Sequence, residues 1–242
     1  MRNHFIGSIV AVLVAFSPVI VAQPAQQSAV PVPDLSGVWG RKGEEFIRTY
    51  SKEPPPMTPW AKERFQAVTD FVDGRARRRD DRDPVLTHCA PPGVTRVYNY
   101  APFEIMQIPG RVIMLFEWDH WVRQIWMDGR GHPEDPDPTW MGHSIGRWDG
   151  DTLVVDTVGF NDKTWIDPLG HPHSEALHLV ERYRRVDPNT LVLDLTFEDP
   201  EAYLKPWTGQ RVFDLKPDWE IAEMYPCEDR SLYGDFFLKK TP

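Results

Sequence analysis

The chain has only two cysteines, Cys89 and Cys227, in 242 residues. No CxxC spacing occurs, which argues against a thiol redox centre or a zinc ribbon. In an oxidising compartment an even pair of cysteines is typical of a disulfide, so we expect Cys89 and Cys227 to be joined. Closing so long a loop stabilises a fold by about 4–5 kcal/mol in the chain-entropy model. Two unpaired thiols are the alternative.

The sequence also lacks an excess of basic residues. Its formal net charge of −9 at pH 7 argues against a nucleic-acid partner, which requires a basic surface. No GxSxG nucleophile elbow, glycine-rich phosphate loop or HExxH zinc motif occurs, so three common enzyme templates are missing. After the first residues, no stretch is apolar enough to span a bilayer.

The N-terminus holds the one long apolar run. Arg2 gives a positive start, and residues 6–21 are apolar apart from small residues and Pro18. This pattern predicts a secretory signal over 1–22 rather than a membrane anchor. The Pro/Gln-rich leader at 23–34 is expected to be disordered. We therefore expect an exported protein, periplasmic or secreted.

Residues 35–242 are expected to form a single domain. Thr58 can cap a helix, Pro59 fits its first position, and apolar residues follow at helical spacing as far as Val72. This helix lies in a predicted insertion at 41–102, between a first short strand and the rest of the fold.

From residue 103 onward, strand patterns alternate with turn residues. The predicted strands are at 103–108, 111–127, 142–149, 151–159, 175–186, 190–198, 210–216 and 219–225. Short turns alternate with long loops, so an up-and-down meander places all the short turns at one end. Eight antiparallel strands of this kind favour a closed barrel that can hold one small ligand. The predicted fold class is therefore all-β.

Two resemblances add to this prediction. Gly37-Val38-Trp39 matches the Gly-x-Trp motif at the first strand of the lipocalin-like (calycin) superfamily, and the chain resembles that superfamily. The resemblance implies an eight-stranded up-and-down barrel, from which the insertion at 41–102 departs. The segments PGRVIMLFE, GDTLVVDTVGFND, HPHSEALHLVERYRR and PCED also resemble a family of exported bacterial proteins, which implies export but no particular activity.

The predicted long-loop end gathers polar and aromatic residues. Its members are His132, Trp140, His143, Asp162, Lys163, Trp165, Asp167, His171, His173, Glu175, Lys205 and Trp207. Barrel ligands commonly bind at the mouth, where loops supply polar groups. His143 and His173 are therefore candidate bases. Asp162 and Glu175 are expected to orient them, because a carboxylate hydrogen bond fixes the imidazole tautomer. The candidate substrate-binding residues are Arg123, Trp140, Arg147 and Trp165.

The same histidines suggest a metal site. His171 and His173 form an HxH pair, and with His143 they supply three nitrogen ligands suited to Zn or another divalent metal. The alternative is that these histidines hold the loop in shape by hydrogen bonds. Alternation places Glu117, Asp119, Trp121 and Arg123 on one strand face, and Glu175, Leu177, Leu179, Glu181 and Tyr183 on one face of another strand. One face of each strand must point inward, so some of these charged residues are expected to be buried. There they pair structurally or act as an acid or base.

Two functions follow as near equals. The first is an exported small-molecule enzyme, a lyase or hydrolase, that uses acid–base or metal-assisted elimination or hydrolysis at the barrel mouth. The alternative is a non-catalytic binding protein for an apolar or aromatic small molecule, in which the histidines only shape the rim. A third hypothesis, an envelope interaction protein that uses the insertion, ranks behind both.

Overall fold

The computed structural model describes residues 32–42, 49–69, 71–72, 75–76, 83–99 and 101–223. The predicted signal at 1–22, most of the leader at 23–34, and Cys227 lie outside these residues. Within the described ranges, no helix has the length and apolar character needed to cross a membrane.

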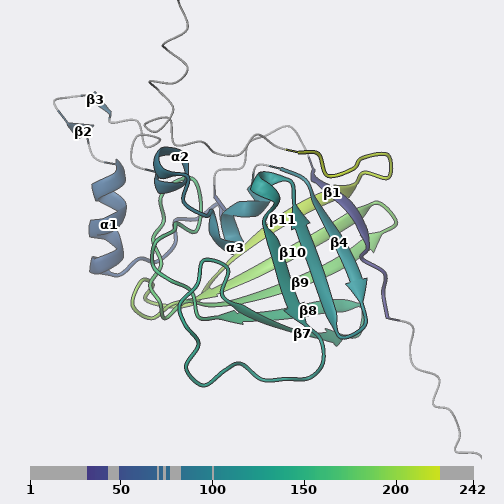
Figure 1. The fold of residues 1–242 in the computed structure, drawn as a ribbon. Coiled ribbons are helices and arrows are strands. Elements are labelled where there is room, and N and C mark those ends of the chain that lie inside the picture. Colours follow the sequence, from purple (N-terminus) through teal and green to yellow (C-terminus); the bar gives the residue numbers. More distant parts are fainter. Residues whose placement is uncertain are drawn as a thin grey trace, which may run out of the picture. The chain divides into compact units, whose positions relative to one another are not determined.

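The described residues form a closed β-barrel of nine strands (Figure 1). The strands are β1 (Gly37–Arg41), β4 (Phe103–Ile108), β5 (Arg111–Phe116), β6 (Val122–Trp126), β7 (His143–Asp149), β8 (Thr152–Val158), β9 (His178–Asp187), β10 (Thr190–Glu198) and β11 (Trp207–Leu215). Their order is β1-β11-β10-β9-β8-β7-β6-β5-β4, and β4 pairs with β1 to close the ring. The all-β closed barrel is confirmed. The prediction of eight antiparallel strands is wrong, because there are nine and one pair is parallel.

The strand predicted at 111–127 is in fact two strands. A 3₁₀ turn, η3 (Trp118–His120), separates β5 from β6. Asp119 and His120 have φ angles of 49° and 50°, which lie outside the β region. The alternation expected through Glu117, Asp119, Trp121 and Arg123 is therefore interrupted at this turn.

The last predicted strand, at 219–225, is also absent from the described part, because 219–223 has no strand structure. β1 takes the place between β11 and β4 instead. Trp39 pairs with Leu215 of β11 on one side and with Phe103 of β4 on the other. The short strand predicted at 35–40 thus closes the barrel.

β6 and β7 run parallel, with Ile125 opposite Ser144 and Trp126 opposite Ile145. A connection between parallel strands must return to the end at which the first strand began. The crossover segment, residues 128–142, therefore runs the length of the barrel, and the prediction that every long loop stays at one end is wrong. Figure 1 shows this segment as the long teal loop beside the barrel.

Between β1 and β4 the chain forms short elements. They are α1 (Pro59–Thr69), the hairpin β2 (Phe71–Val72) and β3 (Arg75–Ala76), α2 (Pro84–His88), α3 (Gly93–Arg96) and the 3₁₀ turn η2 (Val97–Asn99). Thr58 caps α1 by accepting the N–H of Ala61 at 3.3 Å, and Asp83 caps α2 by accepting the N–H of Val85 at 3.0 Å.

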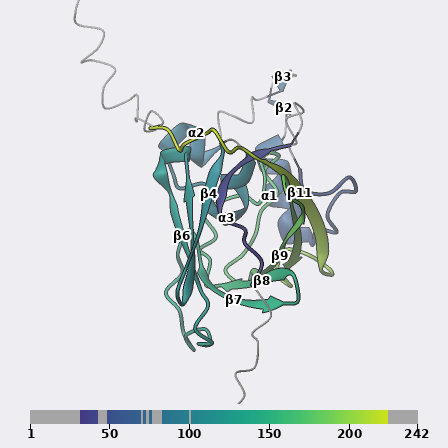
Figure 2. The same ribbon diagram turned by 90° about the vertical axis from the view of Figure 1, so that its right-hand side faces the viewer.

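α3 and η2 are buried along their whole length. In Figure 2, α3 lies between the opposite walls that carry β4 and β9. Tyr98 of η2 reaches Glu181 inside the barrel, with its hydroxyl 3.3 Å from the carboxylate. The end of the barrel is therefore filled by this helical segment.

Aromatic side chains fill most of the interior. Trp39, Phe103 and Phe116 have no exposed surface. Tyr98 packs edge-on against Phe103 and Phe116, with ring centroids 5.4 and 5.3 Å apart, a geometry that aromatic quadrupoles favour.

One ion pair is also enclosed there. Arg123 of β6 and Glu181 of β9 are 2% and 0% exposed. Arg123 Nη1 donates to Glu181 Oε1 at 3.0 Å, and Nη2 donates to Oε2. Burial opposes the charge of Arg123, but the Glu181 carboxylate outweighs it and raises the pKa of the guanidinium. These inward charges therefore pair with each other as part of the core.

Candidate functional site

A row of polar side chains crosses four neighbouring strands. Its members are His143 of β7, Asp156 of β8, His178 of β9 and Glu198 of β10. The strand register places His178 opposite Glu198 and diagonally across from Asp156. Alternate residues of these strands, such as Ser144 and Thr157, are buried and face inward, so the row faces outward.

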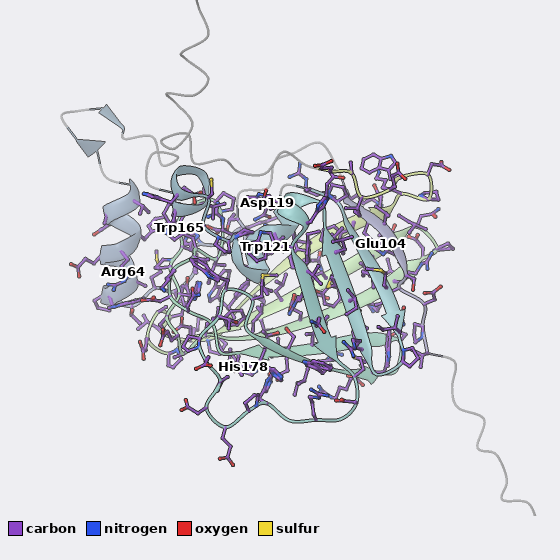
Figure 3. All side chains as sticks on the ribbon, viewed as in Figure 1. Arg64, Glu104, Asp119, Trp121, Trp165 and His178 are labelled. Carbon is purple, nitrogen blue, oxygen red and sulfur yellow. The ribbon has the colours of Figure 1, made fainter. Side chains whose placement is uncertain are left out.

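His132, from the crossover segment, completes this row. Its Nδ1 lies 2.9 Å from Nδ1 of His143, and its Nε2 lies 2.9 Å from Oδ1 of Asp156. His178 Nε2 lies 3.0 Å from the same oxygen, and His178 Nδ1 lies 3.2 Å from Oε2 of Glu198. We call these five residues the histidine chain. His178 is labelled in Figure 3, on the side of the barrel along which the crossover segment runs.

The partners assign the protons of His132 and His143. The Asp156 carboxylate accepts, so His132 donates from Nε2. A neutral His132 then accepts on Nδ1, so His143 donates from its own Nδ1. The lone pair of His143 is left on Nε2, which has no hydrogen-bond partner among the described residues.

The surroundings keep His143 neutral. Partial burial lowers its pKa, and His132 and Arg130 lower it further. At neutral pH, His143 is therefore an imidazole with an unpaired basic nitrogen.

His178 has the opposite character. Both its ring nitrogens face carboxylate oxygens, and only an imidazolium can donate from both. Burial opposes the charge, but Asp156 and Glu198 outweigh burial and raise the pKa of His178. Partial burial likewise opposes the charge of Asp156, while hydrogen bonds from His178 and His132 lower the pKa of this carboxylate. The chain therefore joins a neutral imidazole to a charged one.

His171 and His173 lie elsewhere, buried in the loop between β8 and β9. His171 Nδ1 lies 2.7 Å from Oδ2 of Asp167, and its ring stacks on Phe65 of α1 with centroids 4.6 Å apart. His173 Nε2 lies 2.7 Å from the Thr164 hydroxyl, and burial lowers its pKa. Both rings are therefore hydrogen-bonded to residues of the same loop.

The predicted carboxylates do not orient these imidazoles. Asp162 and Glu175 are exposed, and in the described ranges neither is hydrogen-bonded to His143 or His173. His173 Nδ1 faces the backbone carbonyl of Ser174 at 3.2 Å instead. The charge of Asp162 favours the protonated form of His173, but burial dominates.

The predicted substrate-binding residues are not gathered into one place. Trp140 and Trp165 are half-buried and lie beside cationic side chains, at 6.0 and 5.6 Å from the ring centroids. Arg147 is exposed on β7, whereas Arg123 is enclosed in the core. Figure 3 shows Trp165 well away from His178.

The predicted metal ligands, His143, His171 and His173, are held in three separate hydrogen-bonded pairs. Within the part of the chain that the structure describes, no three His, Cys, Asp or Glu side chains are arranged to hold a metal ion. The structure thus does not bring these histidines together as a ligand set.

Cys89 caps the C-terminal end of α2 with a φ of 54°. Cys227 lies outside the described residues, so the disulfide stays a prediction. Just before it, the chain approaches η3: Ala222 N donates to Glu117 Oε2 at 3.1 Å, and the Ala222 carbonyl lies 3.0 Å from His120 Nε2.

Sequence reasoning grouped His132 with His143 but missed Asp156, His178 and Glu198. A signal for them was present. Each is a polar residue at an outward position near the end of a strand, as in LVVDTV around Asp156. Only the register between strands shows that these positions meet.

An open groove of about 700 Å³ lies beside β10 and β11. It is lined by Thr49, Tyr50, Ser51, Lys52, Asp194, Leu195, Thr196, Thr208, Gly209, Gln210 and Arg211. No family model matches this sequence, and no curated protein is significantly similar to it.

Proposed function

We propose that the protein is a small-molecule enzyme that catalyses elimination or hydrolysis by proton transfer at the histidine chain. The observation that carries this proposal is that His143 and His178, connected through His132 and Asp156, have different partners. Among the described residues His143 has a partner on one ring nitrogen only, whereas both ring nitrogens of His178 face carboxylates. Environments that push two pKa values apart are how a site supplies an acid and a base at one pH.

In this proposal His143 is the base and His178 the acid. His143 Nε2 takes a proton from the substrate or from a water, while His132 accepts the Nδ1 hydrogen bond and stabilises the imidazolium that forms. Asp156 orients His132, because its oxygen fixes the tautomer of that ring. His178 gives its proton to the leaving group, and its longer hydrogen bond, to Glu198, is the one that the substrate replaces.

The strand register sets the scale of the substrate. His143 and His178 lie on β7 and β9, with β8 between them, so their backbones are about 10 Å apart. A substrate of a few heavy atoms, or one with a bridging water, spans the distance between the two rings.

The test is a panel of small esters, lactones and β-elimination substrates, assayed with His143→Gln and His178→Gln. We expect both substitutions to lower turnover at least about 100-fold, as loss of general acid–base catalysis does. His120→Gln is the matched control, because His120 is exposed and lies outside the histidine chain. Turnover that survives in both variants, or a panel without turnover, would count against the proposal.

The pH dependence is a second test of the same roles. Turnover should rise with pH as His143 loses its proton below about pH 6.5 and fall as His178 loses its proton above about pH 6.5. A rate that only rises with pH would remove His178 as the acid.

The alternative remains a lipocalin-like binding protein without chemistry. The barrel interior is filled with side chains, so such a protein would use the groove beside β10 and β11. Most of the exposed lining surface of that groove is apolar, which suits the apolar or aromatic ligand expected from the sequence. Unchanged ligand affinity in His143→Gln, together with weaker binding in Gln210→Ala, would support this function.

We further propose that the protein is exported to the periplasm or secreted. The positive start, apolar run and small residues of 1–22 support this. Sequencing the N-terminus of the protein recovered from cell fractions tests it.

A further inference from the structure

The crossover segment touches the barrel wall at few points. At its two ends, Gly129 and Gly142 have φ angles of 80° and 64°, a conformation that suits glycine. At the far end, Thr139 N donates to the Gly159 carbonyl, and Asn161 N donates to the Thr139 carbonyl, both at 2.9 Å. The stretch between these points is mostly exposed.

His132 is the link in the middle of this stretch. Its ring contacts His143 and Asp156 at 2.9 Å each, and its side chain is 20% exposed. Because the ring touches both residues, it occupies the space between the proposed base and the proposed acid. His132 and the segment that carries it therefore cover the wall beside the proposed base.

The contact between His132 and His143 depends on their protonation. Two Nδ1 atoms 2.9 Å apart can share one proton, because a hydrogen bond needs one donor and one acceptor. A first added proton, on His143 Nε2, leaves the contact in place, with His143 still donating from Nδ1 to His132. A second proton puts a hydrogen on both Nδ1 atoms, and the contact breaks.

We propose that the crossover segment is a lid over the histidine chain, that His132 is its latch, and that protonation of the His132–His143 pair releases it. The gating role rests on the proposed function, whereas the movement of the segment does not.

The charges around the pair agree with release at low pH. The pair, in which His143 belongs to β7, faces Arg130 and its partner Asp128 on the segment and Asp156 on β8. Beyond Asp156 lie the imidazolium of His178 on β9 and the carboxylate of Glu198 on β10. The lowered pKa of His143 means that the closed state binds fewer protons than the open state. By linkage, the closed state is then favoured at higher pH and lost as pH falls.

The test is backbone ¹⁵N relaxation of the amides at 129–141 in the whole protein, between about pH 8 and about pH 4.5, which brackets the usual histidine pKa. At the upper pH we expect order parameters near about 0.85, and at the lower pH values below about 0.6. His132→Ala should give the low values at both pH values. His178→Gln is the matched control, because it alters the wall beside Asp156 and leaves the latch in place.

Order parameters that stay near about 0.85 at the lower pH, or a His132→Ala segment as rigid as the wild type, would overturn the lid. The same samples are also assayed for turnover, so failure of the enzyme proposal can be distinguished from failure of the lid proposal. A lid that opens in a protein without turnover refutes the enzyme alone. Turnover beneath a segment that never moves refutes the lid alone.

Discussion

The buried pair of Arg123 and Glu181 offers the sharpest test of how the barrel is held together. Glu181→Leu removes the only carboxylate bonded to Arg123 among the described residues. It leaves a guanidinium that is 2% exposed with only hydroxyl groups as acceptors, among them Tyr98 at 2.9 Å and Thr157 at 2.9 Å. Removing one partner of a buried pair typically costs about 3–5 kcal/mol, because the other charge is left uncompensated.

The double variant Arg123→Met/Glu181→Leu should recover most of that loss. Replacing both members of a buried pair by apolar residues of similar size is often neutral or stabilising by about 1–4 kcal/mol. The surrounding hydroxyls keep partners, since Tyr98 and Tyr183 face each other at 2.5 Å and Ser144 faces Thr157 at 3.0 Å. We therefore expect the double variant to lie within about 2 kcal/mol of the wild type.

Urea unfolding followed by tryptophan fluorescence measures these differences, provided that the slope with denaturant is unchanged. Asp149→Asn is the matched control, because it breaks the pair with Arg182, whose side chains are 59% and 44% exposed. An exposed pair of this kind contributes at most about 1 kcal/mol. A Glu181→Leu loss as small as that of the control, or a double variant less stable than Glu181→Leu, would refute the reasoning.

Three further predictions concern the site and its supports. Gly142→Ala should cost about 1–3 kcal/mol in urea unfolding, because φ is 64° and the new Cβ would lie 2.8 Å from the carbonyl oxygen of Val158; no measurable loss would contradict that crowding. His173→Ala should lower stability by about 1–3 kcal/mol through loss of the Thr164 contact and leave turnover within a few-fold, whereas lost turnover at full stability would return His173 to the active site. His178 has a raised pKa, so its stabilising contribution is complete below about pH 6.5 and is lost as pH rises through the raised value. Unfolding of wild type and His178→Gln across that range should converge at high pH, and a constant difference would count against the charged form.

The sequence predicted the closed barrel but not its strand count, and the reasons are local. Alternation continues through 111–127, yet the positive φ angles of Asp119 and His120 break the strand, and no residue type there requires them. The parallel pairing of β6 and β7 rests on only two residue pairs. Neither strand has a pattern that distinguishes a parallel neighbour from an antiparallel one.

For the site, closeness along the sequence was a poor guide to closeness in space. His171 and His173 look like metal ligands in sequence because they are close together, but both are buried and engaged by Asp167 and Thr164. Proximity along the chain could not show that burial. Asp156 and His178 are far apart in sequence and adjacent only through the register of β8 and β9.

The described histidines differ in how many of their ring nitrogens have a hydrogen-bond partner. His173 has a partner on each ring nitrogen within a buried loop, so neither nitrogen is available to a substrate. His178 also has two partners, but both are carboxylates, and they make it an acid. Among the described residues, His143 has a partner on one nitrogen alone, and that partner is His132 of the crossover segment. Because a base must keep an available lone pair, His143 is the residue on which a proton-transfer function of this protein depends.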